Sequence, residues 1–113
     1  MTVVKQLRAK TRPVLDDDQS VELAETFRLL GETSRLRIVL TCLRGPMSVG
    51  IIADQVGLTP SLVSHHLRLL RAARLLRAER QGKQVFYSIA DEHVRCVIKD
   101  MVDHVVETSE PED

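Results

Sequence analysis

The 113-residue chain is poor in aromatic side chains, with two Phe, one Tyr and no Trp. Because 43% of its residues are nevertheless hydrophobic, its core must be built from aliphatic side chains. No apolar run approaches the roughly 18 residues of a membrane span, and the N-terminus lacks the charged-then-apolar pattern of a signal segment. We therefore expect one small cytoplasmic domain that does not enter a membrane.

Cysteine is also scarce, and the two that occur, Cys42 and Cys96, form no CxxC pair. A disulfide scaffold is therefore not expected. Cys42 lies among Leu and Val residues of an expected helix, where a free thiol commonly fills the core. Cys96 falls away from the apolar stripe of the last helix, so its thiol should be exposed.

The net charge is zero, but the charges are unevenly placed along the chain. Acidic residues gather in Asp16–Asp18 and from Asp100 onwards. The segment from His65 to Lys83 contains Glu79 as its only acid, against a series of basic residues: Arg68, Arg71, Arg74, Arg77, Arg80 and Lys83. Such a local excess of positive charge is typical of a surface that meets nucleic acid, and the overall charge conceals it.

The first part of the chain predicts an arm followed by scaffold helices. Residues 1–19 form a basic N-terminal arm, either solvated or packed on a partner subunit or DNA phosphate. One helix is expected over about 20–30, closed by Gly31, and a second from Thr33 or Ser34 as N-cap through Leu43. The main domain spans 20–107, and 108–113 form an acidic tail.

The middle of the chain predicts a helix-turn-helix. Ser48 can cap a helix over 49–56, Gly57 ends it, and Thr59 caps the next helix with Pro60 at its first position. Val63, Leu67 and Leu70 should pack inward. The outward positions, which suit base edges and phosphates, are Ser61, Ser64, His65 and Arg68. Of the adjacent His65 and His66, one is expected to face DNA and the other the surface.

The hydrophobic period then changes to that of strands. Two strand-like runs, 75–80 and 84–89, are joined by Gln81-Gly82-Lys83 and predict a β-hairpin. A hairpin directly after a helix-turn-helix is a wing, and its Arg80, Lys83 and Gln84 could reach the DNA backbone or minor groove. The expected fold is therefore mainly α with a β-hairpin (α+β), a winged helix-turn-helix.

The last helix, over 91–107, has potential metal ligands at both of its ends. His93 and His104 fall on the same edge of its apolar stripe, but eleven residues place them about 16 Å apart, too far for one metal ion. Each chain therefore has two half-sites, Asp91 with His93 and His104 with Glu107. If two copies of the helix pack antiparallel across a two-fold axis, the half-sites complete each other.

Two imidazoles and two carboxylates suit tetrahedral Zn(II), with Co(II) or Ni(II) as alternatives. Each residue also has a purely structural interpretation. Asp91 can cap the helix, His93 and Glu107 can be surface residues, and His104 can pair with Asp100 one turn earlier.

Four stretches, in this order and spacing, resemble the ArsR/SmtB family of bacterial metal-responsive repressors. They are Leu30–Ile38, Ser61–Leu67, Arg80–Tyr87, and the pattern Asp91, His93, His104 and Glu107. The resemblance covers about 23–107. It implies a homodimer joined by its first and last helices, bound to double-stranded operator DNA and released by Zn(II) between the last helices. It also implies DNA contacts at Thr59, Ser61, Ser64 and His65, and a relay from His104 toward the backbone near Leu75.

The sequence also departs from parts of the family pattern. Pro60 stands where relatives can have a polar DNA-contacting residue. Ser48 and Ile51 stand where relatives that sense arsenic, cadmium or lead have ligands, so that site is missing.

Two other functions remain open from the sequence: the same repressor responding to a thiol oxidant or another ligand, and a winged helix used for protein assembly. An enzyme with a small-molecule substrate is not expected, because no nucleophile motif is present and four protein ligands leave no open metal position.

Overall fold

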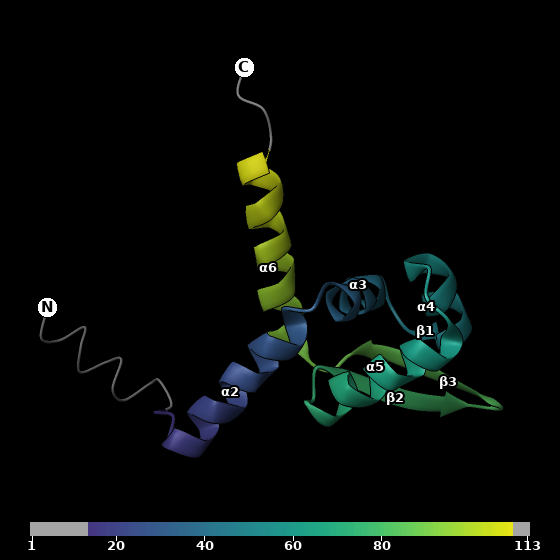
Figure 1. The fold of residues 1–113 in the computed structure, drawn as a ribbon, viewed down its shortest axis with the longest axis horizontal. Coiled ribbons are helices and arrows are strands. Elements are labelled where there is room, and N and C mark those ends of the chain that lie inside the picture. The colour runs from purple at the N-terminus through teal and green to yellow at the C-terminus, as the bar shows by residue number, and fades with distance from the viewer. Residues whose placement is uncertain (1–13, 110–113) are drawn as a thin grey trace, which may run out of the picture.

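The computed structural model describes residues 14–109, and Figure 1 shows how their helices and strands are arranged. The elements, in chain order, are α2 (Asp17–Leu30), α3 (Thr33–Cys42), β1 (Met47–Ser48), α4 (Val49–Val56), α5 (Pro60–Ala72), β2 (Leu76–Gln81), β3 (Gln84–Ile89) and α6 (Glu92–Ser109). The central elements form a body from which α2 and α6 project (Figure 1). This is the predicted winged helix-turn-helix.

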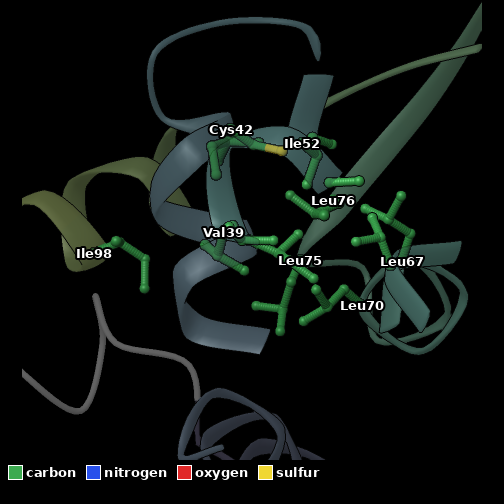
Figure 2. Close-up of a cluster of buried hydrophobic side chains, with 13 residues drawn as sticks. Val39, Cys42, Ile52, Leu67, Leu70, Leu75, Leu76 and Ile98 are labelled. Carbon is green, nitrogen blue, oxygen red and sulfur yellow. The ribbon is translucent and has the colours of Figure 1, made fainter. Parts of the chain in front are cut away.

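The core of the body is aliphatic, as the shortage of aromatic residues predicted. Figure 2 shows side chains from α3, α4, α5, the start of β2 and α6 meeting in one cluster. Its fully buried members include Ile38, Val39, Cys42, Ile52, Val63, Leu67 and Leu70. This cluster fixes α4 and α5 relative to each other, and so it sets the orientation in which α5 presents its outer face to solvent.

The helix-turn-helix forms as predicted. Gly57 ends α4 in the left-handed region at φ 71°, and the Leu62 amide donates to Thr59 Oγ1 at 3.2 Å at the start of α5. The inward side chains Val63, Leu67 and Leu70 are fully buried. Ser48 stands at the N-cap position of α4, but its side chain accepts no capping hydrogen bond.

Two helices begin differently from the prediction. Helix α2 starts at Asp17, three residues early, because Asp16 and Gln19 form a capping box in which each side chain accepts from the other's backbone amide. The cap of α3 is Glu32 rather than Thr33 or Ser34; its carboxylate accepts from the amides of Ser34 and Arg35 at 3.1 and 3.0 Å. The expected arm therefore ends before Asp17, and its residues 1–13 lie outside the described part.

The hairpin is part of a three-stranded antiparallel sheet in the order β1-β3-β2. Strands β2 and β3 pair from Leu76 with Ile89 to Gln81 with Gln84, and Gly82 turns between them at φ 64°. The added strand β1 pairs Met47 with Tyr87. At two residues it is too short to show a periodic pattern, so sequence reasoning missed it.

The projecting helices leave apolar side chains uncovered. In α6 only Ile98 is buried, and in α2 only Leu29. The large exposed apolar residues of these helices are Val21, Leu23, Phe27, Val97, Met101, Val105 and Val106. Helix α6 also continues through Thr108 and Ser109, which were expected in the tail; 110–113 lie outside the described part. No helix within residues 14–109 is long and apolar enough to cross a membrane.

A pair of glycine substitutions tests the turn of the helix-turn-helix. Gly57→Ala should lower the free energy of unfolding by about 1 kcal/mol, because alanine is disfavoured in the left-handed region that Gly57 occupies. Gly50→Ala is the matched control within α4, where an added Cβ meets nothing within 4 Å; it should raise stability by about 0.5 kcal/mol. Urea denaturation at one protein concentration measures the stability of both variants. Equal effects of the two substitutions would contradict the left-handed conformation assigned to Gly57.

Candidate DNA-binding surface and metal half-sites

The front of α5 and the tip of the hairpin form the candidate DNA-binding surface. All eight residues predicted to contact DNA are exposed: Thr59, Ser61, Ser64, His65, Arg68, Arg80, Lys83 and Gln84. Thr59 uses its hydroxyl oxygen as the cap of α5, and the hydroxyl hydrogen can still be donated to a ligand. The structure thus presents short polar side chains at the start of α5, and positive charges behind them and on the hairpin.

Not every arginine of the basic segment contributes to this surface. Arg74 follows α5 in the left-handed region at φ 61°, and its guanidinium forms an ion pair at 3.2 Å with Glu22 of α2. Arg77 Nε donates to Ser88 Oγ across the hairpin at 3.2 Å. The Arg74 charge is therefore partly offset by Glu22, and the Arg77 guanidinium keeps its charge but is held against the hairpin.

Of the adjacent His65 and His66, one was expected to face DNA and the other the surface. The structure instead buries His66. Its side chain is 8% exposed, and Nδ1 is buried with no hydrogen-bond partner. Burial lowers the pKa of His66, an effect that Glu32 partly opposes. Burial therefore favours the neutral form of His66, which packs inside the body, and His65 is the imidazole presented on the front of α5.

The four predicted metal ligands are all exposed, and all lie in or directly before α6. Asp91 does cap the helix, because its Oδ1 accepts from the Val94 amide at 2.9 Å. A carboxylate has a second oxygen, so this cap leaves Asp91 able to bind a cation. The structural interpretation of Asp91 is therefore correct, and it does not exclude a metal-binding role.

His93 belongs to a candidate metal half-site and also lies at the edge of the uncovered apolar surface. It lines an apolar hollow of about 170 Å³ between α2 and α6, together with Leu23, Phe27 and Val97. A chain packed over this surface would come directly beside His93.

One chain does not bring the four residues together. Within residues 14–109 no three His, Cys, Asp or Glu side chains are grouped closely enough to hold a metal ion. The expected relay from His104 to the backbone near Leu75 is not formed within the described chain either. The Leu75 carbonyl accepts from the Ala90 amide at 3.1 Å, and its second lone pair can still accept another hydrogen bond.

The two cysteines lie as expected. Cys42 is fully buried, and burial raises the pKa of its thiol to about 12, so it stays protonated and unreactive near neutral pH. Cys96 is exposed on α6.

Sequence reasoning missed Arg95, which joins α6 to the end of α3 by a hydrogen bond to the Leu43 carbonyl. These residues are 52 positions apart, and no local pattern signals the contact.

Comparison with known proteins places this chain among transcriptional regulators. Residues 32–78 match the family described as "Bacterial regulatory protein, arsR family". A transcriptional repressor SmtB homolog of Synechocystis sp. is 36% identical over 93% of this chain and 80% of its own length. The regulator KmtR of Mycobacterium tuberculosis is 41% identical over 78% of this chain and 68% of its own length.

Solved structures show the same fold. The AntR antimony-specific transcriptional repressor superposes with a TM-score of 0.74 at 28% identity, covering 89% of this chain and 92% of AntR. A homodimeric winged helix-turn-helix DNA-binding domain from Mycobacterium bovis gives 0.76 at 24% identity, covering 89% of this chain and 96% of its own.

The polar front of α5 and the basic hairpin beside it are what a DNA-binding protein needs, and the relatives are transcriptional regulators, not enzymes. The chain belongs to the arsR family of bacterial transcriptional regulators and has their DNA-binding winged helix-turn-helix fold.

Proposed function

We propose that the protein is a metal-sensing transcriptional repressor. Its metal-free homodimer binds an inverted-repeat operator, and Zn(II) bound between the two α6 helices releases the DNA. The observation that carries this proposal is the placement of two separated ligand pairs on α6, with uncovered apolar surface between and beside them.

The apolar surface of α2 and α6 supports the dimer. Val97, Met101 and Val105 are each at least half exposed, as is Phe27 of α2. A contiguous apolar surface of this kind is typical of a protein interface. A two-fold axis across α6 would cover it, and the Mycobacterium bovis domain, which is homodimeric, has the same fold.

The same two-fold axis completes the metal sites. Asp91 and His93 of one protomer would meet His104 and Glu107 of its partner. The donor set fits Zn(II), which accepts imidazole nitrogen and carboxylate oxygen in a closed four-ligand site. Co(II) shares these preferences, and Ni(II) would require additional ligands. AntR has the same fold and is antimony-specific by name, so the fold alone does not decide which element a family member binds.

The dimer would also place two α5 helices in successive major grooves, about 34–36 Å apart along the operator. Metal binding and DNA binding both depend on how the protomers are arranged, so each influences the other. Such coupling is reciprocal: the factor by which zinc lowers the affinity for the operator equals the factor by which the operator lowers the affinity for zinc.

Substitution of one ligand tests the metal site. His104→Ala should bind the operator as tightly as the wild type in the absence of zinc, and it should no longer release DNA when zinc is added. His104 is exposed in the end of α6 that projects away from the body (Figure 1), so its loss removes a metal donor without disturbing the DNA-binding surface. Fluorescence anisotropy of a labelled fragment of the protein's own promoter, titrated with Zn(II) and then a chelator, measures both.

Cys96→Ser is the matched control, because Cys96 is exposed on the same helix and belongs to neither ligand pair. It should retain the full zinc response. If His104→Ala still releases DNA with zinc, the site assignment is wrong. If the wild type ignores zinc but releases DNA when a thiol oxidant is added, and Cys96→Ser does not, the protein senses an oxidant instead.

A second set of variants tests the DNA-binding surface. Lys83→Ala should weaken binding to all DNA sequences alike and reduce the slope of log K against log salt concentration by about two, because the dimer loses one phosphate contact from each protomer. His65→Ala should instead narrow the difference between operator and unrelated DNA, because His65 stands at the front of α5, where base edges are read.

Anisotropy at several salt concentrations separates the two effects. Arg77→Ala is the control, because its guanidinium is bonded to Ser88, and it should change the salt dependence least. If the slope of log K against log salt concentration is unchanged in Lys83→Ala, the hairpin tip does not contact the DNA backbone.

A further inference from the structure

We infer that Arg95 is a positioning residue that holds α6 against the helix-turn-helix and transmits the orientation of α6 to it. The inference rests on the proposed function, because it concerns how an event at the α6 helices reaches the DNA-binding surface.

The contact joins two segments far apart in the sequence. Arg95 Nη1 donates to the carbonyl oxygen of Leu43, the C-cap residue of α3, at 3.2 Å. On its other side Arg95 Nε lies 3.3 Å from Glu92 Oε1, one turn earlier in α6. The Arg95 side chain is 37% exposed, whereas that of Glu92 is 81% exposed. A partly buried hydrogen bond from a charged donor is stronger and more directional than an exposed ion pair.

The acceptor is well placed to influence DNA binding. Directly after Leu43 the chain passes through residues 44–46 into β1 and then α4, the first helix of the helix-turn-helix. Helix α3 also packs against both α4 and α5. A displacement of the Leu43 carbonyl therefore reaches the elements that carry the DNA-binding surface through a short chain segment and a packed interface.

Helix α6 is attached to the body from its start as far as Val102. The Ala90 amide donates to the Leu75 carbonyl at 3.1 Å, Ile98 is buried, and Val94 and Val102 pack against the core. In Figure 2, Ile98 reaches toward the core cluster from α6. After Val102, every residue through Ser109 is exposed, and Figure 1 shows this end of α6 projecting away from the body. A force on this free end, where His104 lies, therefore acts on the attachments between Ala90 and Val102.

Arg95 lies apart from the candidate metal ligands. It is two residues after His93, which places it about 200° around the helix from His93. His104 falls within about 20° of His93. A substitution of Arg95 therefore leaves the donors of both half-sites in place, and its effect on coupling can be separated from an effect on metal binding.

The test uses Arg95→Met in the full-length protein, because methionine keeps most of the aliphatic stem and removes the donors. We expect affinities for zinc alone and for operator alone within about threefold of the wild type. Zinc should lower the operator affinity of Arg95→Met by a factor about tenfold smaller than in the wild type. Substitutions of residues that lie between two coupled sites typically change the coupling by about this much. By reciprocity, the effect of operator on zinc affinity should shrink by the same factor.

A second readout needs no metal. In the zinc-free protein, Arg95→Met should increase amide hydrogen exchange in residues 94–98, because one attachment of this segment is lost. Lys99→Met is the matched control, the same kind of change one turn later at an exposed position, and it should behave as the wild type. Arg95→Lys keeps the charge and a single donor nitrogen in place of the guanidinium, so it should retain part of the coupling. It replaces the methionine variant if that does not fold.

The outcomes separate this inference from the proposed function. If the wild type releases DNA with zinc and Arg95→Met does so to the same extent, Arg95 does not transmit the signal, and the proposed function stands. If the wild type ignores zinc, the proposed function fails, and the exchange measurement alone decides whether Arg95 positions α6. Unchanged exchange in residues 94–98 overturns the inference in either case.

Discussion

The geometry of an α-helix sets the constraint on which this account depends. Eleven residues separate His93 from His104, and a rise of about 1.5 Å per residue places them about 16 Å apart. The two imidazoles share an edge of α6 and cannot share a metal ion within one chain. Ligand-type residues at both ends of α6 therefore have a joint function only if a second α6 runs in the opposite direction. A two-fold dimer meets that requirement.

The uncovered apolar side chains of α2 and α6 point to the same arrangement. The body has its own aliphatic core, built by α3, α4, α5 and the sheet, with Ile98 of α6 added at its edge. Helices α2 and α6 bury little of their own surface, and their exposed Phe27, Met101 and Val105 are costly to leave in water. One axis would cover this surface, complete two metal sites and space two α5 helices for an operator. Dimerisation, metal binding and DNA binding are then consequences of one packing arrangement.

The sequence predicted most of the fold, because its strongest signals are local and periodic. The helix-turn-helix follows from Gly57, Thr59 and the inward spacing of Val63, Leu67 and Leu70, and the hairpin follows from the change of period around Gly82. Sequence reasoning failed where the structure depends on a longer side chain than expected or on contacts between residues far apart in the sequence. It did not predict Glu32 as the cap of α3, because that cap uses a longer carboxylate side chain where hydroxyl residues were available next to it.

The remaining errors have the same cause. His66 is buried because the face of α5 that it occupies meets α3, which the polarity of imidazole does not reveal. The Arg95–Leu43 contact joins residues 52 positions apart. The candidate site itself was found from spacing alone, because its residues share one helix. Its completion by a second chain remains a proposal.

A mixed dimer tests the central claim most directly. One protomer has Asp91→Ala and His93→Ala, its partner has His104→Ala and Glu107→Ala, and two different affinity tags allow purification of the mixed species. Each homodimer lacks half of every shared site, whereas the mixed dimer retains one complete site. Zinc affinity is measured by competition with a chromophoric chelator. We predict one tightly bound zinc ion per mixed dimer and none in either homodimer. A mixed dimer that binds zinc no better than the homodimers would contradict a site shared between protomers.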